Sequence, residues 1–166
     1  MTYSIEQINQ MKQADFVELF GAIFEETPAV AMQAWAARPF QGVSDLHQKM
    51  VAVVRDRMTV AEQVKLIQAH PELGKRGKMA KASVQEQAGA GLSELDESDY
   101  QRLESLNSAY REKFEFPFVM AVKGFGQSDI LAAFEARLEG DEPTERARSL
   151  SEIYKIARLR LSDLIR

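Results

Sequence analysis

The chain of 166 residues contains no cysteine. This absence excludes disulfide bonds, thiolate metal ligands and a thiol nucleophile, and it fits a reducing compartment. Histidine is scarce as well, because His47 and His70 are the only two. Their separation matches no metal-ligand spacing, so we expect no metal site. No run approaches the roughly 18 consecutive apolar residues that a membrane-spanning helix needs, so we expect no membrane partner.

A strong charge of either sign is also missing. The net charge is -4, the pI is about 5.3, and the longest basic tract is KRGK. Nucleic-acid-binding proteins usually carry a basic face, so we expect no nucleic-acid partner. The start, MTYSIEQINQ, lacks the layout of a secretion signal, and the end, SDLIR, is not a peroxisomal address. The sequence therefore predicts a cytoplasmic protein.

The sequence does contain helical periodicity along nearly its whole length. It predicts helices near 4–12, 15–25, 28–37, 44–58, 59–70, 83–91, 96–114, 128–139 and 144–165. Residues typical of N-caps stand at the start of most of these segments: Ser4, Asp15, Ser44, Thr59, Ser128 and Thr144. We therefore predict an all-α fold, a single-domain bundle of roughly eight to nine helices over residues 1–166.

Two segments depart from this pattern. Residues 74–82, GKRGKMAKA, are basic and punctuated by glycine, which favours a solvated loop without the spacing of a phosphate-binding loop. Residues 114–126, FEFPFVMAVKGFG, form an apolar run that a proline interrupts, which favours an extended stretch. Because no second strand is predicted, we expect this stretch to lie along a helical core instead of in a sheet.

His70 is the first candidate for chemistry, in the stretch AHPELG (69–74). Pro71 disfavours the helical conformation for the residue before it, so the preceding helix should end at or just before His70. A histidine bonded to its own helix end is a common structural feature and is the simpler interpretation. A catalytic imidazole is the alternative.

The stretch SVQEQ (83–87) is the second candidate. Ser83 and Glu86 have the spacing of a capping box, which predicts a helix start. The functional alternative requires Glu86 to turn toward a ligand, with Glu86 and Gln87 lining one pocket rim. Ser83 would then cap the helix or donate to the substrate.

Arg160 is the third candidate, because it interrupts an apolar stripe of the last predicted helix. A buried arginine must find an anion, which is either a structural carboxylate or a bound substrate. A structural ion pair, or a stem that extends to water, is the simpler interpretation. The fourth candidate is FPFV (116–119), where the backbone N–H groups after Pro117 could hold a polar ligand. A core-filling aromatic segment is the simpler interpretation there.

Together these features resemble one family. In order, AHPELG, SVQEQAGAGL, LNSAYREKFEFPFVMAVKG and EIYKIARLRLSDL are similar to 2-oxo-4-hydroxy-4-carboxy-5-ureidoimidazoline (OHCU) decarboxylases of the bacterial type. The likeness runs from INQMKQADFVELFGAIFEETP onward, although the basic segment 74–81 departs from many relatives. OHCU decarboxylases belong to the pathway from urate to allantoin.

The resemblance implies a homodimeric, all-α carboxy-lyase that forms (S)-allantoin without a cofactor. It implies that His70 and Glu86 are the catalytic pair. It further implies substrate contacts by Ser83, Gln87, Phe118, Val119 and Arg160, with Pro71 shaping the pocket, and a functional partnership with 5-hydroxyisourate hydrolase. Two alternatives stay open: a non-catalytic helical interaction module, which needs an exposed apolar patch, and that hydrolase itself, whose β-rich fold disagrees with the helical pattern.

Overall fold

The computed structural model describes residues 1–74 and 81–166. Within these ranges the chain is helical and contains no β-sheet, which confirms the predicted all-α fold class. The described residues form two compact units: Met1–Ala69 with Ile153–Arg166, and His70–Glu152. Residues 75–80 of the loop predicted at 74–82 lie outside the described residues. None of the described helices is long and apolar enough to cross a lipid bilayer.

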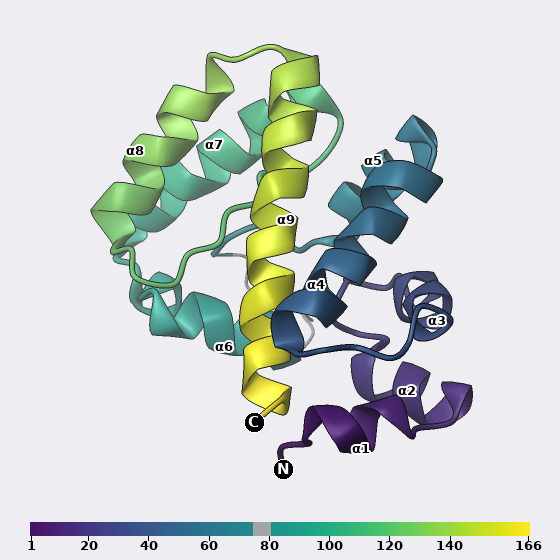
Figure 1. Ribbon diagram of the computed structural model, residues 1–166. Helices are drawn as coiled ribbons and strands as arrows, with labels where there is room; N and C mark the ends of the chain where they lie inside the picture. The colour runs from purple at the N-terminus through teal and green to yellow at the C-terminus, as the bar shows by residue number, and fades with distance from the viewer. Residues whose placement is uncertain (75–80) are drawn as a thin grey trace. The chain divides into compact units, whose positions relative to one another are not determined.

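The first unit is built from the N-terminal helices and the end of the last helix (Figure 1). Its helices are α1 (Ile5–Asn9), α2 (Gln13–Phe20), α3 (Ala29–Trp35), α4 (Val43–Ala52), the π-helix η1 (Val53–Arg57), α5 (Val60–Ala69) and the C-terminal part of α9 (Glu142–Leu164). Phe16, Phe20 and Leu46 are completely buried in its core. The Phe16 ring lies 4.8 Å from Phe20 and 5.8 Å from Phe40, so aromatic packing joins α2 to the loop before α4.

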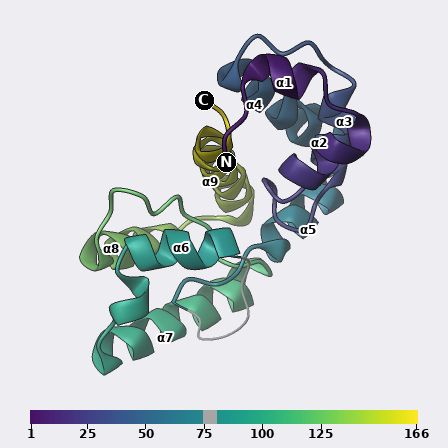
Figure 2. The same cartoon turned by 90° about the horizontal axis from the view of Figure 1, so that it is seen from below.

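The second unit contains α6 (Lys81–Gly89), the 3-10 helix η2 (Leu92–Glu94), α7 (Glu97–Phe114), α8 (Gln127–Leu138) and the N-terminal part of α9. Figure 2 shows α6, α7 and α8 gathered together. The chain between α7 and α8 is extended without being a strand, and it buries Phe116, Phe118 and Val122. The expectation that this stretch lies along a helical core is therefore confirmed.

The predicted caps were correct at two helices. At α1, Ser4 and Gln7 form a capping box, and before α5 the N–H of Thr59 donates to Glu62 at 3.0 Å while its hydroxyl accepts from the Glu62 N–H at 3.2 Å. Four caps were wrong by two or three residues, because the helices begin earlier than Asp15, Ser44, Ser128 and Thr144. At α9 the reason is visible, since Asp141 accepts the Thr144 N–H at 2.9 Å and so caps the helix itself.

Candidate active site

His70 directly follows α5, which ends at Ala69 as the proline rule predicts. The imidazole is buried, with 7% of the residue exposed. A turn over Pro71 to Gly74 follows it directly. An imidazole can act as a general acid or base when it lies within hydrogen-bond reach of the proton it moves.

The turn after His70 is held from two helices. Gln87 of α6 accepts the Gly74 N–H at 2.8 Å through Oε1, and its Nε2 donates to the Glu72 carbonyl at 3.5 Å. Asn107 of α7 donates to the Leu73 carbonyl at 2.9 Å, and Arg111 forms an ion pair with the Glu72 side chain. Every residue from 72 to 74 is therefore fixed by a side chain from another element.

Gly74 has to be glycine in this turn. Its φ is +69°, and a Cβ at this position would lie 2.4 Å from the Leu103 side chain. The glycine of AHPELG therefore serves both the backbone conformation and the close approach of α7.

The inward face of α6 is polar. Ser83 and Gln87 are 3% and 6% exposed, Glu86 is half-buried, and the intervening Val84 and Gln85 are exposed. Positions 83, 86 and 87 share one face of a helix, so these three side chains point to the same side. A helix that buries hydroxyl, carboxylate and amide groups in place of apolar ones is typical of a functional surface.

The capping-box spacing predicted that Ser83 begins a helix, and this prediction was wrong. The helix already begins at Lys81, so Ser83 lies within its first turn.

A cavity of about 160 Å³ lies between the turn and α7. Glu72, Gly74, Asn107 and Arg111 are among the residues that line it. His70 and Glu86 are not among the described residues of this lining, so this cavity is not the substrate pocket that the family resemblance implies.

Phe118 and Val119 lie in the extended chain of the second unit and are both buried. The Phe118 ring stacks on Phe134 at 3.9 Å with an interplanar angle of 9°, so the side chain belongs to the core. Among the described residues, no hydrogen bond is donated by the backbone N–H groups of Phe118, Val119 or Met120. Because buried N–H groups are nearly always paired, this run of donors could hold a polar ligand.

Arg160 lies in the first unit and is 7% exposed. Its Nη2 donates to Glu25 at 2.9 Å, and its Nη1 lies 3.4 Å from the Ala22 carbonyl and 3.3 Å from the Ile23 carbonyl. The anion expected beside Arg160 is therefore the buried carboxylate of Glu25, which the Nη2 edge of the guanidinium contacts. A partner 135 residues away left no signal in the periodicity.

The family model described as OHCU decarboxylase matches residues 9–162. The chain belongs to this family. The OHCU decarboxylase of Haloferax volcanii is 42% identical to it over 96% of this chain and 95% of that protein. The mouse OHCU decarboxylase is 36% identical over 96% of this chain and 91% of that protein.

This chain is also similar to a longer protein, the uric acid degradation bifunctional protein PucL of Bacillus subtilis. It is 42% identical over 98% of this chain, which spans only 33% of PucL. Among solved structures, an (S)-allantoin synthase has a TM-score of 0.78 at 25% identity, covering 98% of this chain and 54% of that one. A second structure, OHCU decarboxylase in the presence of (S)-allantoin, has a TM-score of 0.71 at 20% identity and supports the fold alone.

The structure brings together part of the site that the family resemblance implied. Gln87 contacts the turn that follows His70 and Pro71, and Ser83 and Glu86 share its face of α6. The roles of these residues toward substrate stay predictions, as does the meeting of Arg160 with His70. Sequence reasoning missed Glu25, Asn107 and Arg111, which hold these groups in place.

Proposed function

We propose that this chain catalyses the decarboxylation of OHCU to (S)-allantoin in urate degradation. Family membership over residues 9–162 supports the reaction. The observation that carries it in this molecule is the buried His70, followed by a turn that Gln87 and Asn107 fix through hydrogen bonds of 2.8 and 2.9 Å.

The substrate itself supplies the electron sink. Its reacting carbon carries a hydroxyl and a carboxylate, and a C=N bond lies beside it. When the C–C bond to the carboxylate breaks, CO₂ leaves and the electron pair is accepted by the adjacent C=N. The carbon of the former C=N bond then takes up a proton, its nitrogen takes up another, and the hydroxyl loses its proton to become the carbonyl of the product. We propose that no cofactor takes part, because this chemistry needs no further electron sink.

In this proposal His70 moves the proton, taking it from the hydroxyl or returning it to carbon. Glu86 orients the imidazole and stabilises its charged form, as a carboxylate does beside other catalytic histidines. Delivery of the proton to one face of the planar intermediate accounts for a single enantiomer.

The remaining residues bind substrate. Arg160 holds a carboxylate or ring oxygen, with Glu25 orienting its guanidinium. The backbone N–H groups of Val119 and its neighbours bind a carbonyl oxygen, and Ser83 donates a hydrogen bond. Gln87 and Pro71 shape the pocket around His70, Gln87 through the two bonds it makes to the turn. We expect all of these groups to lie within hydrogen-bond or van der Waals distance of (S)-allantoin in a product complex.

Replacing His70 tests the proposal. Activity of the H70N variant is followed by the optical activity of the allantoin formed, with circular dichroism in the far ultraviolet as the check on folding. General acid–base catalysis typically supplies about 10²–10⁴-fold, so we expect a loss of that size. His47→Asn, which changes the only other histidine, is the matched control. Normal formation of (S)-allantoin by H70N would remove His70 from the chemistry.

We further propose a cytoplasmic homodimer that works in partnership with 5-hydroxyisourate hydrolase. Light scattering on the purified chain tests the dimer, and co-elution with the hydrolase tests the partnership. The alternative of a non-catalytic interaction module gains no support from the exposed apolar side chains. Among the described residues the five exposed large apolar side chains each lie on a different segment: Met1, Met32, Val60, Val84 and Phe125.

A further inference from the structure

Arg137 is a buried cation that neither the sequence motifs nor the proposed chemistry uses. It lies in the last turn of α8 with 9% of the residue exposed. Its Nε donates to Glu145 of α9 at 2.8 Å, and its Nη2 lies 3.3 Å from the Ser149 hydroxyl. Tyr110 of α7 also donates to Glu145, at 2.7 Å. Two side chains of α9 therefore hold the guanidinium, and Tyr110 of α7 holds the carboxylate that it binds.

The third edge of this guanidinium contacts the extended chain. Nη1 donates to the Val119 carbonyl at 2.6 Å, and the guanidinium carbon lies 4.3 Å from the centre of the Phe118 ring. Burial and the contact with Glu145 raise the pKa of Tyr110, so its hydroxyl stays protonated and keeps donating to the carboxylate. Arg137 thus connects α8 and α9 to the extended chain whose Phe118, Val119 and Met120 N–H groups donate no hydrogen bond among the described residues.

Fixing the Val119 carbonyl also fixes the next N–H group. The Val119–Met120 peptide is trans, and in a trans peptide the C=O and N–H bonds point in opposite directions. The Met120 N–H therefore points away from Arg137. A charge-assisted bond to the carbonyl also polarises the peptide, which makes its N–H a stronger donor.

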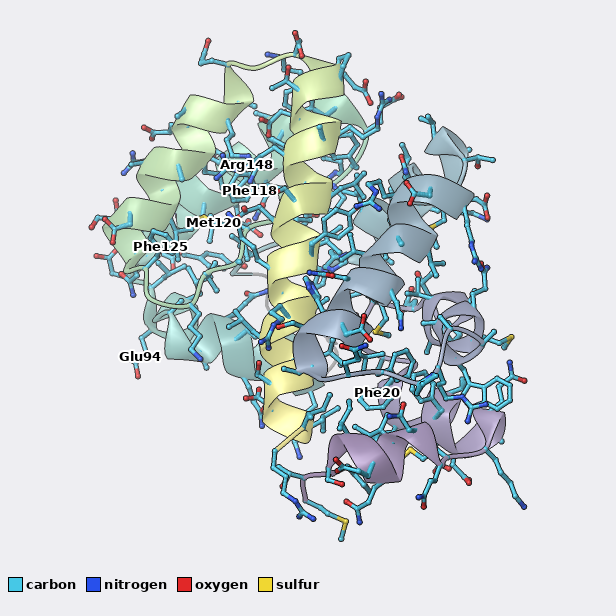
Figure 3. All side chains as sticks on the ribbon, in the orientation of Figure 1. Phe20, Glu94, Phe118, Met120, Phe125 and Arg148 are labelled. Carbon is cyan, nitrogen blue, oxygen red and sulfur yellow. The ribbon has the colours of Figure 1, made fainter. Side chains whose placement is uncertain are left out.

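The other side of Met120 is fixed by an anion. Glu152 of α9, 2% exposed, accepts the Ala121 N–H at 3.1 Å, and Arg148 lies 3.4 Å from the same carboxylate. Figure 3 labels Phe118 and Met120 on the segment and Arg148 on α9. Both peptide planes that flank Met120 are thus held by buried charges, so the direction of its N–H does not depend on bound substrate.

We propose that Arg137 is a positioning residue for the decarboxylase site, and that it aims the Met120 N–H at a substrate oxygen. This inference rests on the proposed function, because it assigns the donors of the extended chain to that reaction. A donor fixed before the substrate arrives needs no reorganisation when the electron pair enters the C=N bond and its charge spreads onto the conjugated ring carbonyl oxygen.

Arg137→Lys tests the positioning role. Lysine keeps the charge beside Glu145 but cannot offer a planar fork to Glu145, Ser149 and Val119 at once. We expect kcat to fall at least about tenfold with KM within about twofold, since this donor acts chiefly on the charge that develops during the reaction, while the side chains that bind substrate are unchanged. Arg102→Lys, at the exposed ion pair of Arg102 with Glu135, is the control and should keep both constants. Unchanged kcat in a folded R137K protein would overturn the proposal.

The donor itself is tested without touching Arg137. Replacing Met120 by its α-hydroxy acid analogue turns the N–H into an ester oxygen and keeps the side chain. Loss of one such donor typically costs about 10²–10³-fold in kcat, and the same change at the exposed Lys123 should cost little. Full activity of the Met120 ester would refute the assignment, whether or not R137K folds. A wild-type chain without OHCU decarboxylation would instead refute the proposed function.

Discussion

The buried pair of Arg160 and Glu25 allows structural stabilisation and substrate binding to be separated. Both residues are about as buried as the apolar core, at 7% and 6% exposure, and their charged atoms lie 2.9 Å apart. Removing one member of such a pair leaves the other charge buried and costs about 3–5 kcal/mol. We therefore expect Glu25→Leu and Arg160→Met each to lose that much free energy of unfolding.

The double variant E25L/R160M should be more stable than either single variant. It leaves no buried charge, and apolar replacements of a buried ion pair are often close to neutral. The carbonyls of Ala22 and Ile23 lose their donor, however, so recovery should be partial, with about 1–3 kcal/mol still missing. Urea denaturation measures these differences, and a loss of 3–5 kcal/mol should lower Tm by about 6–20 °C.

Activity should not follow this recovery. If Arg160 binds substrate, R160M and the double variant both fail to decarboxylate OHCU, although the double variant is well folded. Arg158→Met, a half-buried neighbour on α9, is the control and should change stability by less than about 1 kcal/mol. A double variant that regains both stability and activity would show that the guanidinium only supports the fold. A stable E25L protein would contradict the buried pair itself.

Three further predictions concern the turn, one histidine and one cap. Gln87→Leu removes both bonds to the turn after His70 and should cost about 1–3 kcal/mol in urea unfolding together with activity, whereas the exposed Gln85→Leu should cost neither. Burial lowers the pKa of His47 below its usual 6.5, and the nearby charge of Arg158 lowers it further. The hydrogen bond with the Tyr154 carbonyl raises the pKa but does not cancel these two effects. The folded chain then binds fewer protons than the unfolded chain, so the free energy of unfolding falls as the pH drops through about 6.5. His47→Gln should flatten this dependence of stability on pH, and an unaltered dependence would refute the assignment. Thr59→Ala should lower Tm through the loss of about 1 kcal/mol of capping, and an unchanged Tm would show that the box adds nothing.

Much of the fold follows from local signals in the sequence. Apolar periodicity located the helices, and Pro71 ended α5 where steric restriction requires it. The exact helix starts were harder, because neighbouring acidic residues such as Asp141 compete for the same N–H groups. Ser83 shows the same difficulty, because it has capping-box spacing to Glu86 and yet lies two residues after the first residue of α6.

The site was predictable in its residues and not in their partners. The break in the apolar stripe at Arg160 required a buried anion, but nothing local identified Glu25, 135 residues earlier. Arg137 lies in the last turn of a helix, where a basic residue usually serves the helix dipole, so its bond to Val119 left no sequence signal. Pairings between distant residues depend on tertiary packing, which periodicity does not describe.

Decarboxylation by the wild-type chain tests the central claim most directly. OHCU labelled with ¹³C in its carboxylate is mixed with the purified chain, and labelled CO₂ and the circular dichroism of allantoin are followed together. We predict release of labelled CO₂ well above the spontaneous rate, in step with the signal of (S)-allantoin. Racemic allantoin formed at the spontaneous rate would contradict the account.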